Sequence, residues 1–536
     1  MRNPHGNGRK DPVVSARAPT ADPSLFLTWR KPVSDPVGSY GDWDPHDLEE
    51  NGRALLARIR NHLENIRDIP VAPDIDARQL QDLIDEPLPD SPTGFDDILE
   101  DTWQRVVPYL TLWHHPSFHA YFSTSTSGPA ILADALISTF NVNAHVWKSA
   151  PAAAAVERTV LCWMAQMVGY PQDADAVLVN GASLATLYAL TAARDSSLGD
   201  LRIRERGLAG QDAPTLRIYA SDQAHNSVDK AAIALGVGTD NVVRLPSDEH
   251  QRLQPSVLDA AIHDDLRHGR RPVAVVATVG TTSTGAVDPV EEIAEVCRGH
   301  GLWLHVDAAY GGFWRLVEDI RPHIASLESA DSVVVNPHKV LFSSLEVTAL
   351  YCKRKDALAN TFRLVPEYLR TDPEESAVDY MNHSLQLGRQ FRALKLWWII
   401  RSFGRSGLAA RLTRSVRMAE TLRARAREHP DWTVAASSVL PLVCLRYEPA
   451  SGFPQGEGTD SRRQFHDRLN ASIRDAVSRS GETYLSHAVI PAGYVLRISI
   501  GNIQTRPEDV ERLWELLKKT AEACHRNLLE SERLLP

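Results

Sequence analysis

The 536-residue chain contains little cysteine, no long apolar run and no excess of positive charge. Its five cysteines are widely spaced, odd in number and without paired ligand spacing, so we expect reduced thiols and a cytoplasmic protein. No run approaches the roughly 20 apolar residues of a membrane span, and residues 1–11 lack the apolar core of a signal peptide. The net charge of −10 argues against nucleic acid as a main partner.

The remaining sequence predicts four regions. Residues 1–42 are rich in Pro, Gly, Ser and Asp, which predicts a mobile tail, and residues 43–128 show the periodicity of packing helices. In residues 129–410, near-continuous apolar strands alternate with helices, which predicts an α/β domain with a mainly parallel sheet covered on both faces. In residues 411–536 strands and helices no longer alternate regularly, which predicts a smaller C-terminal α+β domain.

Two charged residues stand where predicted strands end. Lys339 follows the apolar strand 332–335, and Asp307 follows the strand 302–306. In parallel α/β sheets, ligands bind at the carboxyl ends of the strands. An amine and a carboxylate presented there suit pyridoxal 5'-phosphate (PLP), with the lysine as covalent partner and the aspartate opposite the pyridine nitrogen.

Three further polar segments follow strands. Residues 180–186 open a helix and offer backbone N–H groups and a hydroxyl to a phosphate. The same residues are also compatible with a plain turn, or with a degenerate serine-hydrolase elbow that lacks its final glycine. Residues 221–227 carry His225, whose ring suits stacking on a planar cofactor but is equally typical of a structural or surface histidine. Residues 278–285 are rich in hydroxyls and, taken alone, are only a polar loop.

Together, these five strand ends resemble the group II PLP-dependent amino-acid decarboxylases. Residues 113–122 and 387–397 are most similar to the aromatic-L-amino-acid decarboxylases, and the resemblance runs from about residue 45 to about residue 525. It implies the PLP-dependent transferase-like fold type I, with a seven-stranded sheet in the large domain. It also implies a homodimer with active sites at the subunit interface.

The resemblance assigns roles to individual residues. Lys339 would bind the cofactor covalently, and Asp307 would keep the pyridine nitrogen protonated. Ala309 would pack on one face of the ring, and His225 would stack on the other. Further cofactor contacts are expected from Ala182, Ser183, Thr282, Asn336 and His338.

One predicted catalytic residue lies outside the strand ends. Tyr380 falls where the resemblance places a loop tyrosine, which would protonate the substrate carbon after CO₂ leaves while the loop excludes water. Aldehyde-forming relatives tend to lack that tyrosine. Tyr380 and His225 together therefore favour simple decarboxylation, with Lys339 and Asp307 completing the catalytic set.

The substrate pocket departs from the family pattern. Ser123 replaces a usual proline. Asn143 and His145 replace apolar residues of the aromatic decarboxylases, which include a phenylalanine offered across the dimer, and this predicts a more polar pocket. Gly388 leaves room for a bulky ring. The rest of the predicted pocket wall is Trp113, Tyr121, Phe122 and Thr124. The histidines at 114, 115 and 119 lack nearby acidic or cysteine ligands, so we expect no metal.

The sequence therefore predicts a PLP-dependent decarboxylase that converts an L-amino acid, preferably aromatic (Trp, Tyr, Phe or DOPA type), to its amine and CO₂. Three alternatives remain open. The substrate could be a polar or aliphatic amino acid, the same scaffold could couple decarboxylation to oxidative deamination and form an aldehyde, or a non-catalytic binding subunit could retain the fold. Intact Lys339, Asp307 and Tyr380 count against the last alternative.

Overall fold

A computed structural model describes residues 42–122, 124–364, 378–451 and 459–533 of the chain. Its contacts divide the chain after Leu63. In the first part, α1 (Pro45–Glu64) has no buried residue, and Leu48 and Leu56 on it are exposed. All but one residue of the predicted mobile tail lie outside the described ranges. No helix in those ranges is long and apolar enough to cross a membrane.

The second part is built on a seven-stranded sheet in the order β1-β7-β6-β5-β4-β2-β3. Every strand is parallel except β7, which is antiparallel to both its neighbours, so the predicted mainly parallel seven-stranded sheet is confirmed. The short strand β3 gives no continuous apolar run in the sequence, and its two central residues are only half-buried. The strands are β1 (Asp175–Val179), β2 (Leu216–Ser221), β3 (Val242–Leu245), β4 (Arg271–Thr278), β5 (Trp303–Asp307), β6 (Ser332–Val335) and β7 (Thr348–Cys352).

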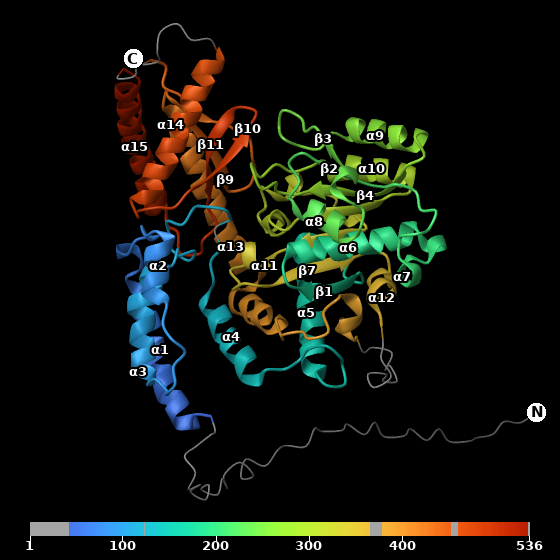
Figure 1. The fold of residues 1–536 in the computed structure, drawn as a ribbon, viewed down its shortest axis with the longest axis horizontal. Helices are drawn as coiled ribbons and strands as arrows, with labels where there is room; N and C mark the ends of the chain where they lie inside the picture. Colours follow the sequence, from blue (N-terminus) through green and yellow to red (C-terminus); the bar gives the residue numbers. More distant parts are fainter. Residues whose placement is uncertain (1–41, 123, 365–377, 452–458, 534–536) are drawn as a thin grey trace, which may run out of the picture. The chain divides into compact units, whose positions relative to one another are not determined.

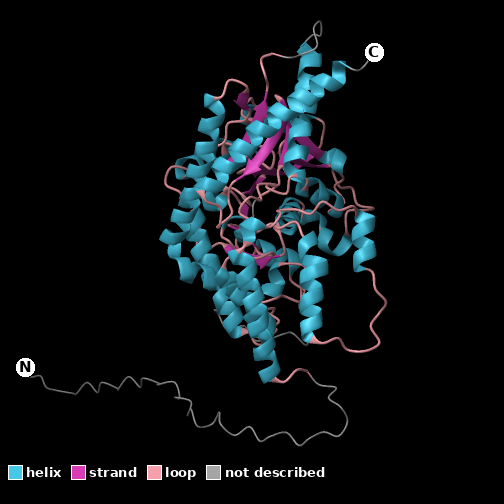
Figure 2. Ribbon diagram, turned by 90° about the vertical axis from the view of Figure 1, so that its left-hand side faces the viewer, coloured by secondary structure: helices cyan, strands magenta, loops and turns pink. Residues whose placement is uncertain are grey.

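Helices cover this sheet (Figure 1), and Figure 2 shows strands lying among helices in the view turned by 90°. Every residue of β5, β6 and β7 is buried, as expected for strands packed on both faces. Helix α6 packs across β1 and β4 to β7, whereas α9 and α10 pack against β4 and β5. The helices here are α4 (Gly128–Phe140), α5 (Pro151–Val168), α6 (Ala182–Ser197), α7 (Ile203–Arg206), α8 (Ser227–Ala234), α9 (Pro255–Arg267), α10 (Val290–His300), α11 (Pro337–Val340) and α12 (Ala357–Phe362).

The C-terminal region forms a second sheet, which is antiparallel and has the order β10-β11-β9-β8. Its separate core includes Trp432, Phe465 and Trp514. The predicted boundary at residue 410 falls inside α13, which packs on α4 and α5 as well as on β8 and β9 and is interrupted at Gly404. The elements are α13 (Ala393–Glu428), β8 (Trp432–Val434), β9 (Leu442–Tyr447), α14 (Thr459–Arg479), β10 (Ser486–Ile490), β11 (Gly493–Ser499) and α15 (Pro507–Arg533).

The segment before α4 is tied to this smaller sheet. It follows two short helices, α2 (Ala77–Ile84) and α3 (Phe95–Asp101). The backbone N–H of His119 donates to the carbonyl of Tyr484 (3.0 Å), and the N–H of Ser499 donates to the carbonyl of His119 (2.8 Å). These bonds hold the following residues at the junction of the two sheets.

Candidate active site

Lys339 lies just beyond the carboxyl end of β6, in the single-turn helix α11. Its ammonium nitrogen makes no hydrogen bond or ion pair within the described ranges and lies 4.6 Å from the ring centroid of Phe122. Burial lowers the pKa of Lys339; the charge of Asp307 opposes that shift, and Arg497 adds to it. A lowered pKa increases the fraction of neutral, nucleophilic amine.

Asp307 is the last residue of β5, directly beside β6 in the sheet. It is 9% exposed, and its Oδ1 accepts a hydrogen bond from the backbone N–H of Ala309 (3.1 Å). Its charge raises the pKa of both Lys339 and His225 against the effect of burial. The structure therefore brings these predicted residues to one edge of the sheet.

His225 stands in the loop between β2 and α8. Its Nδ1 accepts a hydrogen bond from the backbone N–H of Ser227 (3.1 Å), which fixes the ring orientation. Partial burial lowers its pKa, so the neutral imidazole is favoured near pH 7. A neutral ring in this position suits stacking on a planar group.

The turn into α6 provides the predicted phosphate-binding segment. Gly181 adopts a φ of +87°, which a residue with a side chain rarely tolerates. Ala182 opens the helix, and Ser183 is exposed beside it, so backbone N–H groups of the first turn remain accessible. Such a helix start favours an anion.

Asn336 and His338 flank the turn that presents Lys339. The Oδ1 of Asn336 accepts from the hydroxyl of Thr348 (2.7 Å), and Nδ1 of His338 lies 2.7 Å from the carbonyl oxygen of Val347. Burial lowers the pKa of His338 to about 4, so it is neutral at physiological pH. Both side chains thus anchor the lysine turn to the chain at the start of β7.

Thr282 occupies the loop after β4. The hydroxyls of Thr281 and Thr284 lie 3.1 Å apart inside this loop, and the Thr281 hydroxyl also accepts from the N–H of Ala286 (3.0 Å). The side chain of Thr282 is exposed, and its carbonyl accepts a hydrogen bond from Nε of Arg497 (2.7 Å). The loop is therefore fixed internally and by the smaller sheet.

Arg497 is a site residue that sequence reasoning missed. It is buried on β11 and donates to the carbonyls of Thr282 and Tyr121 and to the hydroxyl of Ser486. Its Nη2 has no hydrogen-bond partner within the described ranges. The available signal was an arginine in the middle of the apolar run Val495 to Ile500, since a buried charge needs a partner.

Phe122 forms the aromatic wall beside Lys339. Its ring stacks on Tyr310, with centroids 4.1 Å apart. Tyr121 has a φ of +49° and stacks on Trp113 at 5.3 Å, and both of these rings are exposed. The backbone N–H of Thr124 donates to the carbonyl of Phe122 (2.7 Å). The predicted pocket residue Ser123 lies outside the described residues.

Four predicted residues lie in a different cluster. Asn143 accepts through Oδ1 from the N–H of Arg389 (2.9 Å), and the carbonyl of His145 accepts from the N–H of Met381 (3.1 Å). Gly388 is exposed, with nothing within 4 Å of where a Cβ would stand. Within one chain, none of their described contacts reaches Lys339.

Tyr380 is the fourth residue of that cluster. It is buried, with the guanidinium carbon of Arg389 5.0 Å from its ring centroid, and lines a cavity with Cys162 and Asp175. Asp175 begins β1, whereas Lys339 follows the opposite, carboxyl end of the parallel strand β6. The structure therefore does not place the Tyr380 hydroxyl beside the lysine, and its catalytic role stays a prediction.

The arrangement fits PLP. Lys339 supplies an amine that has no ion-pair partner among the described residues, Asp307 a shielded carboxylate, and the start of α6 a set of N–H groups at a helix N-terminus. Lys339 would hold the aldehyde end, Asp307 the pyridine nitrogen, and Ala182 and Ser183 the phosphate. Fold and site thus define a PLP-dependent enzyme of fold type I.

Known proteins agree with this class. Residues 77–448 match the pyridoxal-dependent decarboxylase conserved domain, so the chain belongs to that family and is a PLP-dependent carboxy-lyase. It is 31% identical to a phenylacetaldehyde synthase of a Rosa hybrid cultivar (90% of this chain, 95% of the relative) and 32% identical to the aromatic-L-amino-acid decarboxylase of Sus scrofa (89% and 96%).

The fold comparison gives the same result. The crystal structure of Oryza sativa TDC with PLP and tryptamine superimposes with a TM-score of 0.85 at 30% identity, covering 90% of this chain and 99% of that one. The predicted fold type I and the predicted cofactor are thereby confirmed.

Proposed function

We propose that this enzyme decarboxylates an aromatic L-amino acid and releases the amine and CO₂. The observation that carries the proposal is the position of the Lys339 amine, which lies against the Phe122 ring while Asp307 ends the neighbouring strand. Relatives named tyrosine decarboxylase, tryptophan decarboxylase and aromatic-L-amino-acid decarboxylase support the aromatic substrate class.

Individual residues of the chain have separate roles in the proposed reaction. Bound PLP supplies an electron sink for the bond to the departing carboxylate. The carboxylate of Asp307 would stabilise a proton on the pyridine nitrogen, and its shielding from water would strengthen that interaction. The His225 ring would pack on the cofactor, and the stacked rings of Phe122 and Tyr310 would exclude water from the lysine side.

Substrate choice is the second part of the proposal. Phe122 and Tyr310, together with the exposed rings of Trp113 and Tyr121, provide flat apolar surface for an aromatic side chain. Asn143 and His145 would instead favour a polar side chain if they entered the pocket. The Asn143 side chain accepts from the backbone N–H of Arg389, and Nδ1 of the His145 ring lies 3.0 Å from the carbonyl oxygen of Asn143. These local contacts support the aromatic class over the polar or aliphatic one.

Aldehyde formation is the other candidate reaction. It consumes O₂ and one water molecule and yields the aldehyde, CO₂, ammonia and hydrogen peroxide in place of the amine. The similarity to the phenylacetaldehyde synthase of rose favours it. Because Tyr380 is buried away from Lys339, the argument from that tyrosine for amine formation lacks structural support. Amine as the main product therefore rests on His225 beside Asp307 and on the decarboxylase relatives.

We also propose a homodimer whose interface completes the pocket. Among the described residues, Leu132 and Phe140 on α4 and Leu345, Leu385 and Leu387 in loops are exposed apolar side chains. Lys395 binds Asp134 (2.9 Å), which also accepts from Ser344, so α4 and the loop carrying Leu345 are fixed together. Exposed apolar groups on a fixed surface favour a protein partner. A cytoplasmic location also stays a prediction, with five free thiols in its favour.

A substrate panel tests the proposed reaction. Purified enzyme with added PLP is incubated with each of the twenty amino acids, DOPA and 5-hydroxytryptophan, and CO₂, amine, aldehyde and peroxide are measured. Equal amounts of CO₂ and amine from an aromatic substrate are expected. Formation of peroxide and aldehyde in equal amounts would show that the product is the aldehyde and not the amine. Turnover of only non-aromatic substrates would overturn the proposed aromatic substrate class.

A further inference from the structure

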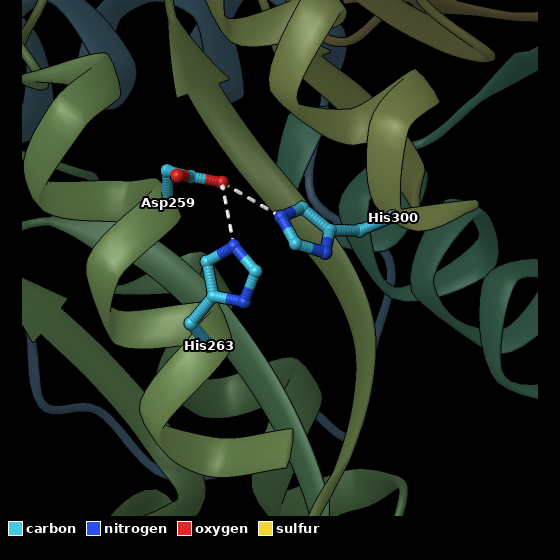
Figure 3. A group of neighbouring side chains, drawn as sticks. All are labelled: Asp259, His263 and His300. Carbon is cyan, nitrogen blue, oxygen red and sulfur yellow. Dashed lines mark hydrogen bonds and ion pairs between the residues drawn. The ribbon is translucent and has the colours of Figure 1, made fainter. Parts of the chain in front are cut away.

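A group of potential metal ligands lies on two helices away from Lys339. Asp259 and His263 are one turn apart on α9, and His300 is the last residue of α10 (Figure 3). Oδ1 of Asp259 lies 2.7 Å from Nε2 of His300 and 3.8 Å from Nε2 of His263. Both imidazoles thus direct the same ring nitrogen toward one carboxylate oxygen.

We propose that Asp259, His263 and His300 bind a divalent transition-metal ion, with Zn²⁺ the best match. Their ligand atoms all lie within 4.8 Å of one another. Tetrahedral zinc with bonds of about 2.1 Å requires ligand atoms about 3.4 Å apart, which small side-chain rotations would provide here. Two imidazoles and one carboxylate suit zinc, whereas Mg²⁺ and Ca²⁺ prefer oxygen ligands alone.

The burial of the three side chains fits an ion at the protein surface. The side chain of His300 is 14% exposed, while those of Asp259 and His263 are 45% and 58% exposed. One ligand is therefore held by packing, and the other two face solvent, from which a water molecule can complete the coordination. Binding at Nε2 requires the Nδ1–H tautomer of His300, so the metal takes the place of the hydrogen bond between Nε2 and Asp259 while the ring proton sits on Nδ1.

The competing explanation is a hydrogen bond that simply joins α9 to α10. That bond needs only Asp259 and His300. His263 is too distant for a hydrogen bond to the carboxylate, yet its ring stands at 80° to the His300 ring with centroids 4.8 Å apart. A metal site requires His263, and the helix link does not.

The metal would stabilise the packing of α9 against α10 and would take no part in catalysis. Helices α9 and α10 pack on β4 and β5, and His300 directly precedes the amino end of β5. Asp307 lies at the other end of that strand. Metal binding is therefore expected to raise the melting temperature and to leave the decarboxylation rate unchanged.

The test compares single-site variants of the holoenzyme. After chelator treatment and gel filtration, ZnCl₂ is titrated calorimetrically into wild type, His263→Gln and His268→Gln. His268 is the matched control, because it caps the C-terminus of α9 and its Nδ1 lies 3.4 Å from the carboxylate of Asp264, yet it is not part of the three-ligand group. We expect one ion per chain in wild type and His268→Gln, with affinity at least ~10-fold lower in His263→Gln.

Thermal unfolding gives a second readout. ZnCl₂ should raise the melting temperature of wild type and of His268→Gln, and the shift should be lost in His263→Gln. Absence of stoichiometric binding in wild type would overturn the proposal. Equal zinc affinity in wild type and His263→Gln would also overturn it, because the ion would then be bound elsewhere.

Discussion

Lys339 and Arg497 contact the same phenyl ring. The ammonium nitrogen of Lys339 lies 4.6 Å from the ring centroid of Phe122, and the guanidinium carbon of Arg497 lies 4.9 Å from it. One cation comes from the large sheet domain and the other from the smaller sheet. Burial lowers the pKa of Lys339 and the charge of Arg497 adds to that shift, so the space that the two side chains share favours an anionic ligand.

Removing the second cation should change the pH at which PLP attaches. In Arg497→Gln, loss of the repulsion raises the pKa of Lys339, so less neutral amine is present at a given pH and the attachment curve moves to higher pH. The measurement is visible absorbance after PLP is mixed with cofactor-free enzyme across a pH series.

The matched control for this variant is Arg446→Gln. Arg446 is also a buried arginine of the smaller sheet, but it pairs with Asp467 (2.5 Å) and Glu448 (2.9 Å). Its loss should lower stability without moving the attachment curve. Equal shifts in the two variants, or a shift to lower pH in Arg497→Gln, would contradict the prediction.

The ion pair between Glu157 and Arg389 should be a major source of stability. Their side chains are 2% and 1% exposed and 2.5 Å apart, and Arg389 also donates to the carbonyls of Ala144 and Leu178 (both 2.9 Å). Arg389→Gln leaves a buried carboxylate without its cation, which typically costs about 3–5 kcal/mol. Urea unfolding measured by tryptophan fluorescence checks this value.

The comparison variant is Arg427→Gln. Arg427 pairs with Glu420 at 2.8 Å, but both side chains are 56% exposed, so we expect a loss below about 1 kcal/mol. Similar destabilisation by the two substitutions would show that burial does not set the strength of the Glu157–Arg389 pair.

Strand ends were the most predictable part of the site. Lys339 and Asp307 follow runs of apolar residues, so the pattern of apolar residues along the sequence was enough to locate the carboxyl edge of the sheet. Arg497 was missed because its partners, Thr282 and Tyr121, are more than two hundred residues away and contribute backbone carbonyls that have no sequence signature. Antiparallel β7 likewise depends on pairing with β1 and β6, which local periodicity cannot specify.

For Tyr380, the catalytic role implied by the family resemblance does not agree with the position of the side chain in the structure. Its ring packs on Arg389 near the start of β1, so we expect Tyr380→Phe to leave the ratio of amine to aldehyde unchanged. Tyr351→Phe is the control, because Tyr351 is a buried neighbour whose hydroxyl donates to the carbonyl of Leu161 (2.9 Å). A rise in aldehyde and peroxide in Tyr380→Phe alone would support the catalytic role that the sequence predicted.

Release of labelled CO₂ from a carboxyl-labelled aromatic L-amino acid, compared between wild type and Lys339→Ala with PLP present, tests the central claim most directly. We expect wild type to release CO₂ and Lys339→Ala to lose nearly all of this activity, because we propose that the Lys339 amine beside Phe122 holds the cofactor. Equal release by both proteins, or none by PLP-loaded wild type with any aromatic substrate, would contradict it.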